Sequence, residues 1–240
     1  MLKQIMLILI GTLPFNRLRI YFYRSLMGYD ISYDSFIGAF NYLNMDSCRI
    51  VGGRIGRMNY VQVGRLEMRC GSEIRKFNKY QQLNRVVLGE KSLVVSRNNF
   101  VGSRAGLSPF KECEILAIGS NTIITRSHSF DLVDSITIGD NVTFAGSGIQ
   151  VWTHGFDLNH VRIQSPVVIE NDVYVGSRSI ILQGVHIGSL VSLGAGTVVS
   201  KSINDPGFYV SSQLIRKAEV RDYSQHGDIV VHKDEKFIRK

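Results

Sequence analysis

The chain has 240 residues, of which 44% are hydrophobic and 20% charged, as expected for a folded domain rather than a disordered or fibrous chain. Its net charge is +8, but it contains no long Lys/Arg run and no nucleic-acid motif, so the basic character does not indicate nucleic-acid binding. The three cysteines are widely spaced, which argues against a disulfide framework and favours reduced thiols and a cytoplasmic location.

The first thirty residues are apolar at the start and then mix aromatic residues with arginines. The uninterrupted apolar run, residues 5–10, is far shorter than the roughly 20 residues that a membrane-spanning helix needs, and no signal-peptide cleavage pattern follows it. Helical spacing is seen at Leu18, Tyr21, Phe22 and Leu26. We therefore predict a helical segment over 1–30. It caps the following domain, or it contacts the inner face of a membrane through residues 1–26, and the two roles are compatible.

A six-residue repeat dominates the second half of the chain. Aliphatic residues recur six apart at Ile169, Val175, Ile181, Ile187, Leu193 and Val199. A second set of small residues follows four places later, at Val173, Val185, Val191 and Thr197. This period fits neither an amphipathic helix nor a simple strand, and it is typical of a parallel β-helix. Three hexads make one triangular coil, and successive coils stack at about 4.8 Å. Residues 169–204 are thus expected to form two complete coils.

The same repeat extends toward the N-terminus with weaker phase. Earlier hexads begin at Leu88, Val94, Phe100, Ile138, Phe144 and Gln150, with Ile118 and Ile124 between the two groups. From about residue 31 onward, less regular coils are marked by Ile37-Gly38, Ile55-Gly56 and Val63-Gly64. Residues 66–86 cannot be assigned to hexads from the sequence. The prediction is an all-β domain over 31–204 and a C-terminal tail, 205–240, that packs on the last coils.

Two segments interrupt the repeat, residues 130–137 and 155–168. Each follows a histidine, and "HSFDL" from His128 is echoed by "HGFDL" from His154, 26 residues later. If 130–137 leaves the coil as a loop, the two histidines share a corner one rung apart. If Phe130 instead begins a third hexad, they fall on different corners. Because of the echo, we favour the first threading, with a loop excursion near 155–168.

The stretch "IENDVYVGSRSIILQGVHIGSLVSLGAGTVVSKSI" resembles the hexapeptide-repeat acyltransferases, and "VWTHGFD" followed by a loop resembles their sugar O-acetyltransferase branch. The resemblance is strong over about 136–203 and weak before residue 88. It implies left-handed coils, whereas the general rule for parallel crossovers favours the right-handed form. It also implies a homotrimer with active sites between neighbouring subunits, acetyl-CoA as acyl donor, and no metal.

The resemblance further implies roles for single residues. His154 matches the catalytic base at the entrance of the loop. Coenzyme A is expected along the last coils, near Ser177, Ala195, Ser200, Lys201 and Arg216. For Arg216 the carry-over is weakest, because "VSSQLIRK" lacks the glycine and the proline that usually precede the matching basic residue. Lys201 would pair with a coenzyme phosphate, although a solvated surface lysine is the alternative.

The chemistry of acetyl transfer supports these residue types. A hydroxyl must lose its proton as it attacks a thioester, and histidine, which titrates near neutral pH, is the usual base. His128 either touches the sugar, supports His154 or is structural. Asp157 or Asp131 could orient an imidazole, but an aspartate at the start of a loop is more commonly a turn former, and we favour that role.

The sequence therefore predicts an acetyl-CoA-dependent O-acetyltransferase that acts on a sugar hydroxyl by direct attack, with His154 as general base. The acceptor is expected to be a surface polysaccharide or its lipid-linked precursor. An N-acetyltransferase of an amino-sugar nucleotide, a non-catalytic β-helix scaffold and a zinc hydratase that uses His128, His154, His160 and His186 remain as alternatives.

Overall fold

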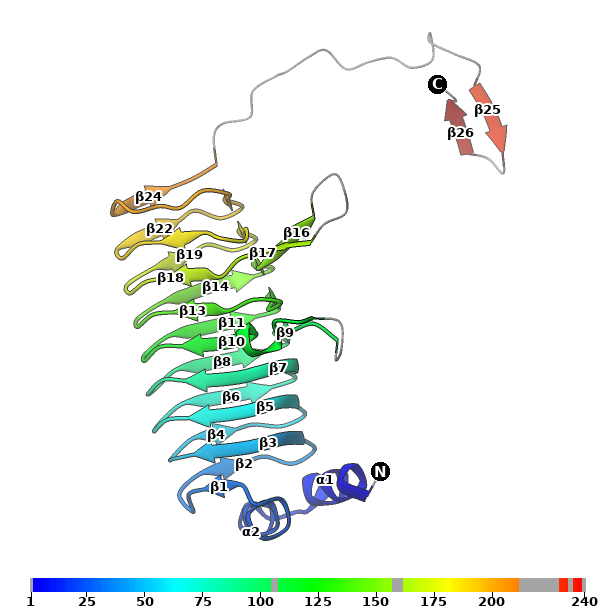
Figure 1. Ribbon diagram of the computed structural model, residues 1–240, viewed down its shortest axis with the longest axis vertical. Coiled ribbons are helices and arrows are strands. Elements are labelled where there is room, and N and C mark those ends of the chain that lie inside the picture. The colour runs from blue at the N-terminus through cyan, green and yellow to red at the C-terminus, as the bar shows by residue number, and fades with distance from the viewer. Residues whose placement is uncertain (1, 105–107, 157–161, 212–228, 233–234, 239–240) are drawn as a thin grey trace.

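The computed structural model describes residues 2–104, 108–156, 162–211, 229–232 and 235–238. These form a long, three-sided stack of β-coils with two helices at its base (Figure 1). The predicted fold class is confirmed: an all-β, left-handed parallel β-helix with an N-terminal helical segment and an excursion that begins near residue 155.

The helices and two parallel sheets make up the stack. The helices are α1 (Leu2–Thr12), α2 (Asn16–Met27) and the short 3-10 helix η1 (Lys111–Cys113). The nine-stranded sheet contains β2 (Phe36–Ile37), β4 (Arg54–Ile55), β6 (Glu73–Lys76), β8 (Leu93–Ser96), β11 (Ile123–Arg126), β14 (Thr143–Ser147), β19 (Tyr174–Val175), β22 (Val191–Leu193) and β24 (Gly207–Tyr209).

The thirteen-stranded sheet supplies the other two sides, which are continuous in its longest strands. It contains β1 (Asp30–Ile31), β3 (Tyr42–Ile50), β5 (Tyr60–Met68), β7 (Lys79–Leu88), β9 (Asn99–Val101), β10 (Ile115–Ile118), β12 (Ser129–Asp131), β13 (Ile136–Ile138), β15 (Gln150–Trp152), β18 (Val167–Ile169), β20 (Ile180–Ile181), β21 (His186–Ile187) and β23 (Val198–Val199). Two antiparallel hairpins lie outside these sheets: β16 (His154–Phe156) with β17 (Arg162–Gln164), and β25 (Ile229–His232) with β26 (Glu235–Ile238).

The hexad markers form three buried columns inside the prism. Ile169 pairs with Ile187, Val175 with Leu193 and Ile181 with Val199, so each coil here has 18 residues, as the repeat predicts. All the aliphatic markers from Ile169 to Val199 are buried. Burial of such side chains contributes about 1.5–3 kcal/mol each. The strict repeat is therefore the packing requirement of the core.

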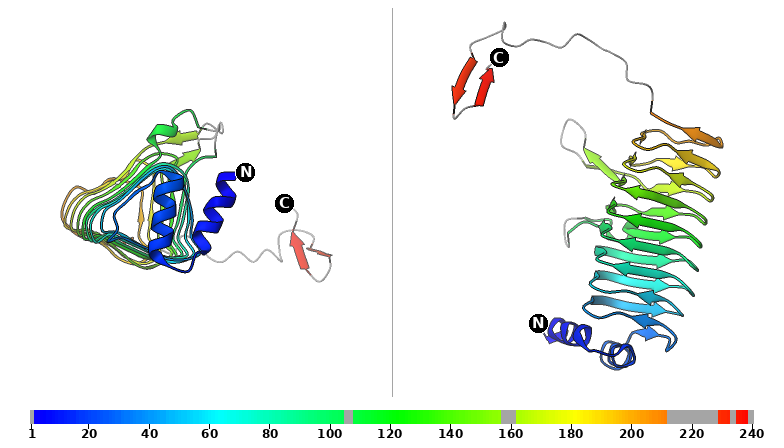
Figure 2. Two further views of the ribbon diagram at one scale, coloured as in Figure 1. Left: turned by 90° about the horizontal axis from the view of Figure 1, so that it is seen from below. Right: turned by 180° about the vertical axis from the view of Figure 1, so that it is seen from behind.

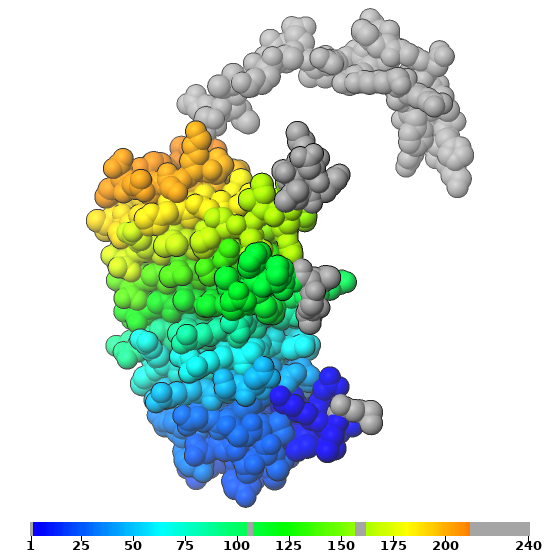
Figure 3. Space-filling view, viewed as in Figure 1, coloured from blue at the N-terminus to red at the C-terminus, as the bar shows by residue number. Residues whose placement is uncertain are grey.

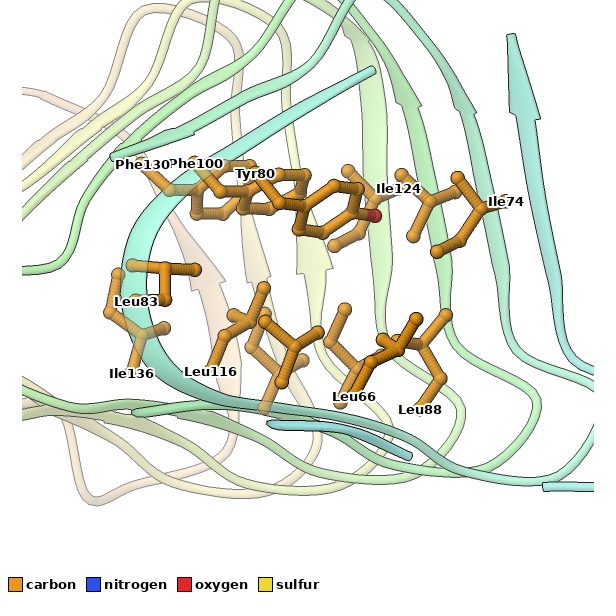
Figure 4. Packing of buried hydrophobic residues seen from close by; sticks show 14 of the residues in the cluster. Leu66, Ile74, Tyr80, Leu83, Leu88, Phe100, Leu116, Ile124, Phe130 and Ile136 are labelled. Atoms are coloured by element: carbon orange, nitrogen blue, oxygen red, sulfur yellow. The ribbon is translucent and has the colours of Figure 1, made fainter. Parts of the chain in front are cut away.

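Aromatic residues fill one column in the middle of the stack (Figure 4). The rings of Tyr80, Phe100 and Phe130 stack at centroid distances of 4.6 Å in two successive pairs. Phe130 is buried and pairs with Phe100 below and Val151 above. The favoured threading is therefore wrong, because β12 continues the coil and residues 130–137 do not leave it. Packing of the Phe130 ring in the aromatic column of the core therefore determines the threading, and the sequence similarity between the two histidine segments does not.

Further details of the threading also differ from the prediction. Val151, rather than Gln150, is the buried marker, because a bulge in β14 adds one residue beside Gly146 and Gly148. Both glycines have positive φ, which suits this insertion. The segment 66–86 does form part of the coils, with Ile74 and Tyr80 at marker positions and one extra residue at Gln82, where the pairing of β5 with β7 shifts. The coils continue past 204, since β24 pairs with β22.

Both excursions leave the stack at the same corner (Figure 2). The hairpin β16–β17 follows β15, and residues 102–114 follow β9, which lies two rungs below in the same column. The second excursion was not predicted. Its base is fixed by Glu114, a fully buried carboxylate that accepts hydrogen bonds from Ser103 and Lys111.

Candidate active site

A histidine–carboxylate pair joins two neighbouring rungs at this corner. Asp131 ends β12, and its partner in the next rung is Trp152 of β15. The chain then turns into β16, which begins with His154. His154 Nδ1 lies 2.5 Å from Asp131 Oδ2. Each of these two side chains is about one-fifth exposed, so the pair is anchored in the protein and still reaches solvent.

The backbone around the pair is held from several directions. Buried Thr153 donates its hydroxyl to the Asp131 carbonyl oxygen at 2.8 Å and accepts the Asp134 N–H at 2.9 Å. The Ser165 N–H donates to the Thr153 carbonyl oxygen, which closes the base of the excursion. These bonds fix the exit of β15, and with it the start of β16. The imidazole is therefore placed by the scaffold rather than by its own loop.

The carboxylate determines what the imidazole can do. Burial raises the pKa of Asp131, and the hydrogen bond from His154 opposes that effect. An ionised Asp131 accepts the Nδ1–H, so the Nε2 lone pair of His154 is the one that can take a proton. The turn-forming role, favoured from the sequence for Asp131, does not describe this contact. Asp157 and His160 lie outside the described residues.

Aromatic side chains flank the imidazole. The Phe156 ring meets the His154 ring edge-on at 5.5 Å and is 63% exposed. Trp152 is also exposed, and its indole N–H donates to Gln150 Oε1 at 3.1 Å. Phe156 therefore offers a flat apolar face next to the base, and Trp152 is a second exposed ring two residues before it in the chain. Phe156 was not predicted as part of the site, although its position two residues past the histidine was an available signal.

His128 has a different environment from His154. It is 1% exposed, its Nε2 lies 2.9 Å from Thr125 Oγ1, and its Nδ1 accepts the Ile149 N–H at 3.1 Å. Burial lowers its pKa to about 4, so it is neutral near pH 7. The predicted substrate-binding role is therefore corrected to the structural one, because both ring nitrogens are used inside the coil.

The predicted coenzyme residues fall at two corners. Ser177 and Ala195 lie one rung apart at the corner between the β19/β22 and β20/β23 sides, above Gly146. A Cβ added at Gly146 would lie 1.8 Å from Ser177 Oγ, so Ser177 lies directly over position 146, which has no room for a side chain. Ser200 and Lys201 are exposed and follow β23, at the corner that also carries His154 in lower rungs. Arg216 lies outside the described residues.

One chain does not bring all these residues together. His154 and Ser177 lie at opposite ends of one side of the prism, which is about six residues or roughly 20 Å long. His186 pairs with Glu170 on another side, at 2.8 Å between Nε2 and Oε1. Among the described residues, no group of three or more His, Cys, Asp or Glu side chains is arranged to hold a metal ion.

Residues 166–201 match a known family, described as bacterial transferase hexapeptide (six repeats). The chain is 33% identical over 104 residues to the galactoside O-acetyltransferase of Escherichia coli K12. The aligned region covers 42% of this chain and 51% of that protein. It spans about half the length, or less, of the curated relatives it matches.

Solved structures give weaker similarity. A hexapeptide-repeat acetyltransferase from Vibrio cholerae O1 biovar eltor, complexed with acetyl coenzyme A, is 25% identical, with a TM-score of 0.43 over 56% of this chain and 71% of that one. An N-acyltransferase variant from Bacillus cereus, in complex with dTDP-4-amino-4,6-dideoxyglucose and coenzyme A, is 21% identical, with a TM-score of 0.45 over 58% and 75%. The family match confirms the predicted resemblance to hexapeptide-repeat transferases.

Proposed function

We propose that this protein is an acetyl-CoA-dependent O-acetyltransferase, with a sugar hydroxyl as acceptor and His154 as general base. The observation that carries the proposal is the His154–Asp131 pair, held at 2.5 Å on the coil directly below the repeats that match the transferase family. The similarity to a galactoside O-acetyltransferase supports the acceptor class. A saccharide that becomes part of a surface polysaccharide, or its lipid-linked precursor, fits a protein with a basic, apolar N-terminus.

In the proposed reaction, His154 Nε2 takes the proton of the attacking hydroxyl while the oxygen bonds to the thioester carbon. The tetrahedral intermediate then collapses, the carbon–sulfur bond breaks, and the proton passes to the departing thiolate. Asp131 acts as a positioning residue, because its carboxylate orients the ring and stabilises the imidazolium between the two transfers. The exposed rings of Trp152 and Phe156 would flank the acceptor sugar.

We further propose a homotrimer in which the corner bearing His154 in one copy faces the corner bearing Ser177 and Ala195 in the next. The positions of these residues support an inter-subunit site, because the two corners lie roughly 20 Å apart within one chain. The small side chains above Gly146 would let a thin pantetheine arm approach the backbone. Ser200, Lys201 and Arg216 would contact the nucleotide end of coenzyme A, with Lys201 pairing a phosphate.

The direct test is replacement of His154 by Ala. We expect kcat to fall at least ~100-fold with an unchanged oligomer, given the usual contribution of a general base. His186→Ala is the matched control, because His186 is likewise paired with a carboxylate but lies on another side. Turnover near wild type in His154→Ala would overturn the assignment. Hydroxyl and amine acceptors should be compared in the same assay, since an amine preference would replace O-acetylation by N-acetylation.

Asp131→Asn tests the positioning role separately. The amide keeps the size of the side chain but not its charge, so we expect kcat to fall about 10-fold or more with little change in KM for either substrate. A rise in KM alone, with kcat retained, would contradict a role in orienting the base and would indicate contact with substrate.

A further inference from the structure

The two N-terminal helices pack on the base of the stack, each through a narrow strip of buried side chains (Figure 2). α2 lies across the open triangular end, where it buries Ile20 and Tyr23. α1 lies beside the first coils, packs against β3 and buries Leu7 and Ile10. The predicted capping role is thus visible in α2. The remaining faces of both helices are not used by the described part of the chain.

Those remaining faces are strongly apolar. Large hydrophobic side chains exposed on and beside the helices are Leu2, Ile5, Ile8, Leu9, Phe15, Leu18, Tyr21 and Leu26, with exposed fractions from 41% to 73%. We call this set the N-terminal surface. Figure 3 shows the deep-blue N-terminal segment projecting from the side of the first coils. Eight large apolar side chains exposed within 25 residues are uncommon on a soluble domain and mark an interaction surface.

An apolar cleft of about 190 Å³ separates the two helices. Its lining residues are Met6, Leu9, Ile10, Leu13, Phe22 and Leu26. A cleft lined in this way has no polar side chain to specify a hydrogen-bonding ligand. It suits flexible hydrocarbon, such as the acyl chains at the surface of a bilayer.

Charge identifies the partner more closely. The four charged residues between Leu2 and Gly28 are Lys3, Arg17, Arg19 and Arg24, and all are basic. Arg19 is buried, and its Nε donates to the Ile37 carbonyl oxygen, whereas Arg17 is exposed. Lys3 Nζ donates to the Met45 carbonyl oxygen and remains exposed. An apolar surface whose two helices carry only cationic side chains complements a layer of anionic headgroups, and it opposes pairing with a second copy of itself.

We propose that the N-terminal surface docks on a bilayer of anionic phospholipid, with α1 and α2 lying in the interface. No helix among the described residues is long and apolar enough to cross a membrane. The helices therefore contribute apolar side chains at the depth of the headgroups, and Lys3 and Arg17 contact phosphate. In the proposed trimer, three such surfaces would lie at the same end of the assembly and act together. The docking itself does not depend on the catalytic assignment.

The test is flotation of the full chain with liposomes. Binding is expected to vesicles containing about 30 mol% phosphatidylglycerol, with at least tenfold weaker binding to pure phosphatidylcholine and a fall at high ionic strength. The double variant Ile5→Glu/Ile8→Glu should lose at least tenfold in binding while keeping its melting temperature, since both side chains are exposed. The matched control, Leu190→Glu, changes an exposed leucine in the upper coils and should bind normally.

Lys3→Gln/Arg17→Gln should reduce the preference for anionic over neutral vesicles without unfolding the protein. Equal binding of wild type and Ile5→Glu/Ile8→Glu would overturn the proposal. A second result would also overturn the proposal: the wild type forms a larger oligomer that dissociates in the Ile5→Glu/Ile8→Glu variant, and neither protein binds vesicles. In that case a second copy of the chain would cover the surface. These readouts do not use acetyl transfer, so they separate the docking proposal from failure of the proposed enzyme activity.

Discussion

The lower and upper coils share one backbone fold but use the same corner in different ways. In the lower coils, the buried side chains Asn41, Asn59, Asn78, Asn98 and His128 form a ladder between rungs. Each accepts a backbone N–H from the rung above, at 2.8–3.1 Å, and the last of these bonds reaches Ile149. In the upper coils this position is occupied by Ser179 and Thr197, whose hydroxyls bond to Gly176 and Gly194 carbonyl oxygens.

The outward side chains at this corner differ as well. Large basic residues occupy it in three lower coils, at Arg57, Lys76 and Arg126, with Ser96 at this position in the coil between the last two. In the upper coils the equivalent row is small, with Ser147, Ser177 and Ala195. At the lower corner, hydrogen bonds join the rungs and long side chains cover most of the backbone. At the upper corner, the small side chains leave the backbone accessible. The comparison indicates that the lower coils act as a scaffold, and the proposed coenzyme corner begins where the ladder ends.

The pH dependence of stability is the largest effect expected from this ladder. The pKa of buried His128 is lowered to about 4 from 6.5, so the unfolded chain takes up a proton first as pH falls. Stability contributed by the neutral ring is present above pH 6.5 and is lost progressively toward pH 4, by about 3 kcal/mol. His128→Asn, which extends the asparagine ladder, should remove this component. Denaturant unfolding of both proteins at pH 7 and pH 4.5 measures the difference, and parallel losses would contradict it.

Removal of one ladder amide should destabilise the lower coils by a smaller amount. Asn78→Ala leaves the buried Asn98 N–H without its acceptor, whereas Asn59 Oδ1 keeps its donor, the backbone N–H of residue 78. We therefore expect the free energy of unfolding to fall by about 2 kcal/mol. Thr197→Ala removes a bond within one turn only and should cost about 1 kcal/mol. Equal losses in thermal or urea unfolding would show that the ladder adds nothing beyond local turn bonding.

The outer row is tested by a matched pair of substitutions. Ser177→Arg in the upper coils should raise KM for acetyl-CoA about tenfold or more, corresponding to about 1.4 kcal/mol, with kcat less affected. Ser96→Arg makes the same change at the equivalent corner of a lower coil and should leave kinetics unchanged. If both variants behave alike, the distinction between scaffold and coenzyme corner is wrong.

Much of the fold could be predicted because the core needs a buried aliphatic side chain at every sixth position. The markers from Ile169 to Val199 are buried as expected, and the coils of 18 residues follow directly. The prediction failed where a repeat is long or irregular. The segment 66–86 lacks the glycine that usually follows a marker, and the bulge near Gly146 shifts the phase by one residue. The excursion over 102–114 has no periodic signal.

The site was predictable in part for a similar reason. His154 follows a regular coil and stands at the start of an excursion, which sequence alone reveals. The choice of Asp131 as its partner depends on which rungs are adjacent, and the misleading echo between residues 128 and 154 obscured that adjacency. The burial of His128 likewise follows from its place above Asn98, a contact between residues 30 positions apart.

Subunit complementation tests the central claim most directly. His154→Ala chains, expected to be nearly inactive, and Ser177→Arg chains, expected to keep about a tenth of the activity at limiting acetyl-CoA, are to be co-expressed with different tags and purified as mixed assemblies. If the site is built from two copies, random assembly restores about a quarter of wild-type activity, because one interface in four joins an intact His154 to an intact Ser177. If both residues serve a site within one chain, every chain carries a lesion, and the mixed assemblies are no more active than the Ser177→Arg parent.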